Sequence, residues 1–281
     1  MKTVLYFEWM RKRQKILKRI IAPLLIVVVL FVLCTLLDFI IPEFNKNYMK
    51  WPDMLKDFLC LKSWTSHMWF NVWQLFALTY PFYLIYSLMK ELADSVSEED
   101  RLETVVYLHN AGISRKMIFW GKSFVYLAQA FVCCVSLLIV NAVLALILGS
   151  LQMAFNMLLH YVFLYLVCLV YLAITLFIVS YKRAEGVSDD AVLTVLILPC
   201  LISRLPALLQ FFSSLLELTG REGRSVDTVG GIAERIKMFT IVSPITWCWP
   251  AFEGTVFHFI FGAAVLIVML TAGLSIYTHK G

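Results

Sequence analysis

The chain has 281 residues, of which 61% are hydrophobic, and its mean hydropathy is +0.81. Such a composition excludes an ordinary soluble globular domain. The net charge of +5 does not indicate nucleic-acid binding, because the basic residues lie mostly in loops on one predicted side of a membrane. We therefore expect an all-α polytopic membrane protein that forms a single transmembrane domain and has no nucleic-acid partner.

Residues 1–19 are predicted to form a basic amphipathic helix that lies in the membrane interface. The alternative, the basic start of a signal peptide, is disfavoured because no small-residue cleavage site follows and the next apolar run is long enough to span. One face of this helix carries charged side chains, which are Glu8, Arg11, Lys12, Lys15, Lys18 and Arg19. The other face carries mainly apolar side chains, which are Leu5, Trp9, Met10, Ile16 and Ile20.

Six apolar segments follow, each long enough to cross a bilayer as a helix. The predicted spans are 20–41, 66–90, 119–150, 157–181, 191–216 and 254–277. Of the 24 Lys and Arg residues, fifteen fall on the side of the two termini and eight on the opposite side. The excess of positive charge predicts that both termini are cytoplasmic and that the protein is integral to the cell membrane.

A polar island, residues 97–122, separates the second span from the third. Ser97 and the acids that follow it are typical of a helix N-terminus. Gly112 favours a helix end, and Ser114 can cap the next helix. We therefore predict a cytoplasmic helix over 97–115.

The end of this island, Gly121-Lys122-Ser123, has the form of a phosphate-binding loop. The full motif also needs a Gly at position 116, which is Lys here, and a strand before it. We treat the match as chance and expect no nucleotide site in the chain. Because signatures of nucleophilic or metal-dependent catalysis are also missing from the sequence, we expect a protein that is not an enzyme and binds no cofactor itself.

The cysteines, at positions 34, 60, 133, 134, 168, 200 and 248, include no C-x-x-C pair and have no His at ligand spacing. We therefore expect no metal site. Most of them fall in apolar segments, where Cys behaves as a small hydrophobe. Cys60 and Cys248 both lie on the predicted outer side, and whether they pair stays open.

The fifth predicted span carries Arg204 between Pro199 and Pro206. The prolines are expected to kink or break the helix. A guanidinium at membrane depth is costly unless it faces water, a carboxylate or headgroups. Two alternatives stay open: Arg204 reaches outward from a broken helix, or it lines a transport path together with Trp73 and Tyr80 of the second span. Trp73 is equally consistent with an aromatic belt at the interface.

The polar island resembles the first cytoplasmic loop of ABC-2 type exporter permeases. The residues that carry this resemblance are Glu98, Glu99, Arg101, Glu103, Thr104, Leu108, Ile113, Ser114, Arg115, Ile118, Gly121 and Lys122. The chain departs from the family pattern in having no Gly before Thr104, and Ala111-Gly112 where Thr-Pro is common. The layout of an amphipathic start, six spans and Ser243-Pro244 before the last span is also similar, and implies a re-entrant segment over 238–252.

The resemblance implies a permease that pairs with a second, identical or related permease and with two separate ABC ATPase subunits, which bind the ATP and Mg. The substrate would be a hydrophobic or amphipathic peptide or drug. The residues expected to contact the ATPase are Glu98, Glu99, Arg101, Thr104, Val105, Leu108, Ile113, Ser114 and Arg115.

Two other functions remain open. A secondary transporter or channel without an ATPase would be built from inverted repeats and paired broken helices, of which the sequence has one broken span and no obvious repeat. A membrane-embedded enzyme would need carboxylates, His or Cys gathered at one depth, and the sequence offers no such set.

Overall fold

The computed structural model describes residues 2–41, 61, 67–101, 108, 110, 112–182, 189–218, 243–249 and 256–279. This part of the chain is helical and contains no strand. Six of its helices are long and apolar enough to cross a membrane, which confirms the predicted number of spans. The chain is therefore an integral membrane protein of the all-α class.

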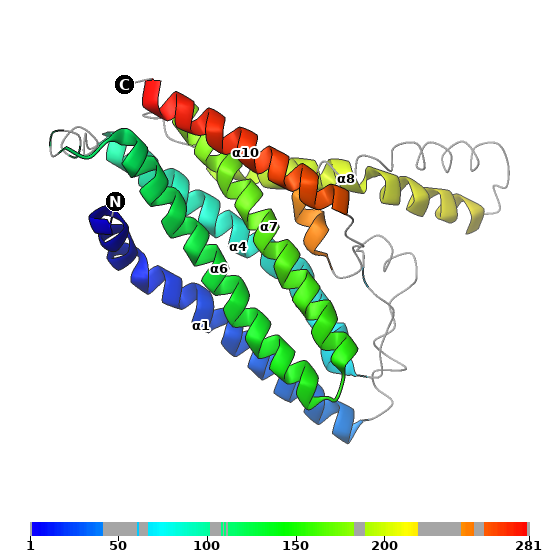
Figure 1. Cartoon of the computed structure of the whole chain (residues 1–281). Helices are drawn as coiled ribbons and strands as arrows, with labels where there is room; N and C mark the ends of the chain where they lie inside the picture. Colours follow the sequence, from blue (N-terminus) through cyan, green and yellow to red (C-terminus); the bar gives the residue numbers. More distant parts are fainter. Residues whose placement is uncertain are drawn as a thin grey trace.

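Five long helices form the bundle that is seen in Figure 1. They are α1 (Lys2–Ile40), α4 (Met68–Arg101), α6 (Arg115–Ile147), α7 (Leu151–Lys182) and α10 (Val256–His279). Both chain termini lie at the same end of the bundle as the turn between α4 and α6, and we call it the termini end (Figure 1). The turn between α6 and α7, closed by Gly149 with a φ of 72°, lies at the opposite end.

Helix α1 is continuous, so the predicted interfacial helix and the predicted first span form one element. Its buried positions Lys12, Ile16, Arg19, Pro23 and Val27 recur at helical spacing and face the bundle. The buried stripe that these positions form on α1 therefore begins within the basic segment, residues 1–19. Lys12 and Arg19 are only 5% and 8% exposed, whereas the sequence pattern had placed them on a polar outer face.

Helix α4 extends to Arg101, beyond the predicted end of the second span at residue 90. The reason is burial: Leu92, Ala93 and Val96 continue the buried face of the helix toward the termini end. Ser97 therefore lies inside α4, where the sequence pattern suggests the cap of a new helix. At the other end of α4, the backbone N–H of Met68 donates to Asp38 Oδ2 of α1 over 2.9 Å. Asp38 thereby supplies an acceptor for one of the N–H groups in the first turn, which have no partner within the helix.

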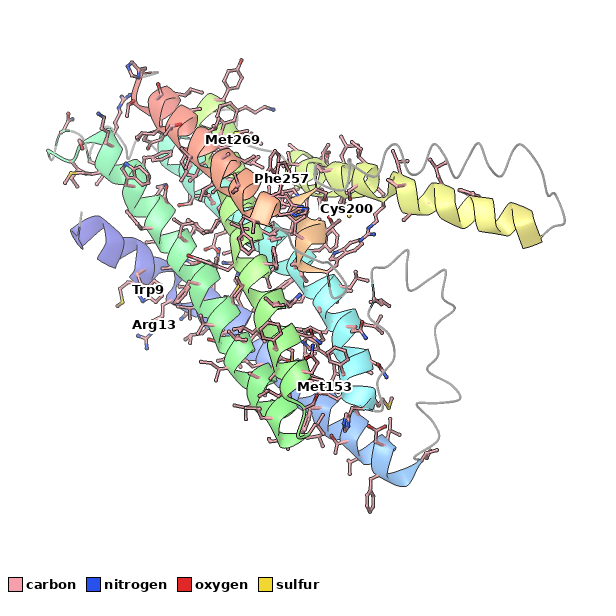
Figure 2. The ribbon with its side chains drawn as sticks, turned by 45° about the vertical axis from the view of Figure 1, so that its right-hand side comes forward. Trp9, Arg13, Met153, Cys200, Phe257 and Met269 are labelled. Atoms are coloured by element: carbon pink, nitrogen blue, oxygen red, sulfur yellow. The ribbon has the colours of Figure 1, made fainter. Side chains whose placement is uncertain are left out.

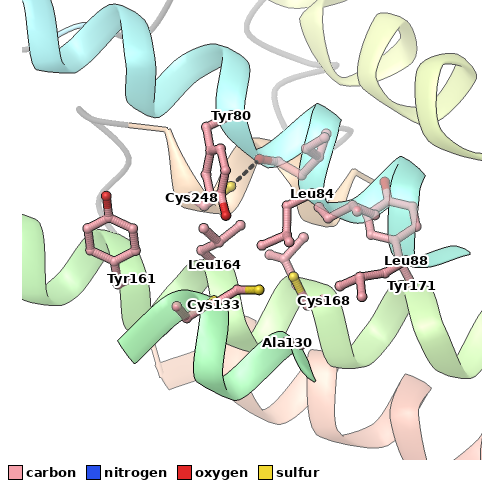
Figure 3. Close-up of a cluster of buried hydrophobic side chains, with 14 of the residues drawn as sticks. Tyr80, Leu84, Leu88, Ala130, Cys133, Tyr161, Leu164, Cys168, Tyr171 and Cys248 are labelled. Atoms are coloured by element: carbon pink, nitrogen blue, oxygen red, sulfur yellow. Dashed lines mark hydrogen bonds between the residues drawn. The ribbon is translucent and has the colours of Figure 1, made fainter. Parts of the chain in front are cut away.

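The core lies between α4, α6 and α7, where side chains from all three helices interdigitate (Figure 3). Tyr80, Leu84 and Leu88 of α4 pack against residues of α6 and α7 such as Ala130 and Leu164. Helix α10 packs along α7, and Gly273 allows a close approach, since a Cβ there would lie 3.3 Å from the Cα of Phe177.

Helix α8 (Asp189–Leu218) and the short 3-10 helix η3 (Pro244–Cys248) complete the described fold. Helix α8 is continuous through Pro199 and Pro206, so of the two expected effects of the prolines, a kink or a break, the break does not occur. It contacts α4 and η3, and its C-terminal part extends away from the bundle (Figure 1). All five residues of η3 are buried, and it packs on α4, α7 and α8. The other residues of the predicted re-entrant segment, 238–242 and 250–252, lie outside the described part.

Candidate functional site

The residues predicted to contact an ATPase are only partly described by the structure. Glu98, Glu99 and Arg101 belong to the last turns of α4. Leu108 and Ile113 are half-buried beyond its end, while Thr104 and Val105 lie outside the described residues. Within the described residues, the island therefore consists of the end of α4, the turn at Gly112 and the start of α6.

The turn into α6 has the predicted local chemistry. Gly112 adopts a φ of 80°, a conformation that favours glycine. The N–H of Ile113 donates to the carbonyl of Leu108 over 3.0 Å. Ser114 is the N-cap of α6, and its Oγ accepts from the N–H of Met117 at 3.4 Å. Beside it, Arg115 has one buried guanidinium nitrogen, Nη1, without a hydrogen-bond partner in the described structure.

Beneath the island, Glu91 of α4 is the centre of a buried ionic cluster. Its carboxylate lies 3.0 Å from the Lys12 ammonium and 2.6 Å from the Arg19 guanidinium, both from α1. The Glu91 side chain is 5% exposed. Buried ions of this kind are stable only when they are paired, because desolvating a lone charge is costly. The cluster therefore fixes the basic part of α1 against α4.

The cluster continues into α6 through hydrogen bonds. Arg19 donates to the Ser87 carbonyl at 2.8 Å and to Gln129 Oε1 at 3.2 Å. The Tyr126 hydroxyl donates to the Glu91 carbonyl at 2.9 Å. We use the name polar seam for these residues together with the bonded pair Ser95 and Lys122, so that it consists of Lys12, Arg19, Ser87, Glu91, Ser95, Lys122, Tyr126 and Gln129.

Lys122 completes the polar seam at the termini end. It is 2% exposed, and its ammonium donates to the Ser95 carbonyl at 2.9 Å and to Ser95 Oγ at 3.3 Å. Ser123 is also buried and donates to the Phe119 carbonyl at 2.8 Å. In this structure the Lys122-Ser123 pair is part of the packing of α6 against α4. Lys122 and Tyr277 also line a cavity of about 10 Å³, the space that one water molecule requires.

The three predicted path residues lie in two places. Trp73 and Tyr80 are buried on α4, at 1% and 4% exposure. Arg204 lies on α8, where its guanidinium carbon is 3.9 Å from the centroid of the Trp249 ring. This is cation–π geometry, a partner that the sequence alternatives did not include. Trp249 directly follows η3, so this contact joins α8 to the end of η3.

His160 of α7 connects Trp73 to η3. Its Nδ1 donates to the Cys248 carbonyl, which fixes the neutral ring as the tautomer with a free electron pair on Nε2. Its ring meets that of Trp73 edge-on, with centroids 5.4 Å apart. Nε2 has no hydrogen-bond partner among the residues with described side chains. Trp73 is therefore linked to η3 through His160, and Arg204 is linked to the residue that follows η3 through the Trp249 ring.

Cys248 is a free, buried thiol whose Sγ donates to the Ile245 carbonyl at 3.0 Å. Cys60 lies outside the described residues, so the structure does not address a bond between the two.

No family model, no curated protein and no solved structure matches this chain. Within the described ranges, no group of three or more His, Cys, Asp or Glu side chains is placed to hold a metal ion. Sequence analysis missed Glu91 and His160, which turned out to organise the polar seam and the contact with η3.

Proposed function

We propose that this chain is the permease subunit of an ATP-driven exporter of the ABC-2 type, which forms the substrate path and couples to separate ATPase subunits. In this proposal a second permease, identical or related, completes the path, and ATP and Mg bind to the ATPases. The island is the cytoplasmic coupling element, and both termini are cytoplasmic. The substrate is a hydrophobic or amphipathic peptide or drug.

One observation carries the proposal: α4 bears residues of both predicted sites. Glu98, Glu99 and Arg101 occupy its last turns, and Trp73 and Tyr80 lie in its first half. With 34 residues it is about 50 Å long at 1.5 Å per residue. A displacement of the island by an ATPase would therefore reach the path residues through one continuous helix.

Through the polar seam, such a displacement of α4 would be transmitted to α1 and α6. Glu91 and Ser95 bind side chains of α1 and α6 in the part of α4 that adjoins the island. Movement of this part of α4 would carry the basic part of α1 and the start of α6 with it. At the other end, Trp73 would transmit the movement through His160 to η3, which fills the space between α4, α7 and α8.

The proposal requires a stand-alone ABC ATPase in an adjacent reading frame, and it is tested in proteoliposomes that contain the chain and this ATPase. The variant Leu108→Asp/Ile113→Asp places charge on the half-buried apolar side chains of the island. We expect ATP-driven transport to fall at least about tenfold, because apolar anchors carry most of the energy of an interface. Asn110→Asp is the matched control, since Asn110 is exposed in the same segment and its substitution adds a similar charge.

The proposal fails if the double variant transports at the wild-type rate, or if the control variant loses as much activity as the double variant. Transport that persists without ATP but collapses with an ion gradient would instead identify a secondary transporter.

A further inference from the structure

Helix α1 divides its basic residues between two sides. Lys12 and Arg19 face inward to Glu91, whereas Arg13, Lys15 and Lys18 are exposed. Figure 2 shows Arg13 and Trp9 directed away from the other helices. The outward cations are therefore accessible to a partner outside the described bundle, whatever the function of the protein.

The position of these cations along α1 indicates what surrounds them. From Ile21 onward the outward face is apolar, with exposed side chains such as Ile21 at 50% and Leu25 at 60%. In a membrane protein this face contacts lipid tails. At 1.5 Å per residue, Lys18 lies about 5 Å and Arg13 about 12 Å before Ile21, and long basic side chains reach along the helix toward the headgroups. This places the three cations at the headgroup layer.

The local charge is strongly positive. Residues 12–19 contain five cations, and the sequence has no acidic residue between positions 9 and 37. In the described structure the carboxylate of Glu91 lies within 4 Å of Lys12, Lys15 and Arg19. One carboxylate offsets only one of these charges. Lys15 is 65% exposed and 3.9 Å from Glu91, so it can face both the carboxylate and the membrane surface.

We propose that Arg13, Lys15 and Lys18 form a binding surface for anionic lipid headgroups. The apolar side chains that alternate with these cations, Trp9, Leu17 and Ile21, are themselves exposed and suit the boundary between headgroups and tails. A soluble acidic partner would pair with the cations but would offer these apolar side chains no apolar environment. The bound phosphates hold α1 from outside while Glu91 holds it from inside.

The test uses the purified full-length chain in detergent, incubated with equal amounts of phosphatidylglycerol and phosphatidylcholine of the same acyl chains. Native mass spectrometry then measures which lipid is retained. We expect the wild type to retain the anionic lipid with a preference of about tenfold or more, since each basic residue near an anionic surface contributes about 1 kcal/mol. The variant Arg13→Gln/Lys15→Gln/Lys18→Gln is expected to lose this preference.

Two further variants keep the result interpretable. Lys116→Gln/Lys182→Gln removes exposed cations at the same end of the bundle and should keep the preference. Arg13→Gln/Lys18→Gln leaves the contact of Lys15 with Glu91 intact and should lose most of the preference without lowering the thermal unfolding temperature.

The proposal is overturned if the triple variant still selects phosphatidylglycerol, or if the control variant loses the preference equally. It is also overturned if millimolar inorganic phosphate displaces the lipid completely, because the site would then recognise a free anion. None of these outcomes depends on an ATPase, so they leave the proposed transport function to its own test.

Discussion

Glu91 is the residue whose removal should matter most for stability, because two buried cations of another helix depend on it. Glu91→Gln keeps the size of the side chain and removes its charge, which leaves Lys12 and Arg19 buried without a counter-ion. Breaking a buried pair in this way costs about 3–5 kcal/mol. We expect a large drop in the thermal unfolding temperature of the purified protein, measured in one detergent.

A surface ion pair of the same chain provides the control for this variant. Lys90 and Asp189 lie 2.7 Å apart, but their side chains are 39% and 54% exposed. Exposed pairs contribute about 0–1 kcal/mol, so Asp189→Asn should hardly change the unfolding temperature. Equal effects of Glu91→Gln and Asp189→Asn would contradict the structural role given to the polar seam.

His160 should hold η3 in place through its bond to the Cys248 carbonyl. His160→Leu leaves this buried carbonyl without that donor, a loss of about 1–3 kcal/mol. We expect the Cys248 thiol, which is 1% exposed, to react about tenfold faster with a maleimide, measured by peptide mass spectrometry. His160→Asn, whose amide can replace Nδ1 as donor, should react more slowly than the Leu variant. Identical rates in wild type and His160→Leu would count against this role.

Sequence reasoning missed the partners of Glu91 although a signal was present. Lys12 and Arg19 are seven residues apart, which places them on the same face as Ile16, Pro23 and the rest of the buried stripe. Extending the apolar stripe of the first span backward would have placed both cations inward. The contact between His160 and Cys248, 88 residues apart, has no comparable local pattern and depends on tertiary packing.

At the scale of the elements, the packing of α10 on α7 rests on the absence of a side chain at Gly273. A Cβ there would lie 3.3 Å from the backbone of Phe177, and backbone cannot move aside easily. Gly273→Leu should therefore separate the helices and destabilise the protein by about 1–3 kcal/mol, seen as a lower thermal unfolding temperature. Ala264→Leu is the matched control, because Ala264 is exposed on the same helix. A control variant as unstable as Gly273→Leu would show that the close approach is not the cause.

The existence of the helices followed from the sequence more readily than their limits did. Apolar runs about 20 residues long predicted all six spans, because a helix of that length crosses the bilayer and satisfies its backbone hydrogen bonds within itself. The limits of α1 and α4 were missed for one reason: charged residues were taken as the end of the buried region. Lys12, Arg19 and Glu91 compensate one another, so burial continues through them.

At the scale of the whole molecule, the bundle has two chemically different ends. The termini end carries the polar seam, the exposed cations of α1 and the turn at Gly112. The opposite end carries the uncharged turn at Gly149 and exposed apolar side chains such as Leu151, which is 77% exposed. This asymmetry of charge motivates the proposed orientation, with the termini end in the cytoplasm.

The central claim is that an ATPase docks on the island, and site-specific photocrosslinking tests it most directly. A benzoyl-phenylalanine residue is introduced at Asn110, exposed in the island, or at Gln152, exposed at the opposite end. Each variant is co-expressed with the stand-alone ABC ATPase that the proposal requires in an adjacent reading frame, and is irradiated in intact cells. We predict a crosslinked product of permease and ATPase from position 110 and none from position 152. A product from position 152, or none from position 110 while the ATPase is present, would contradict the account.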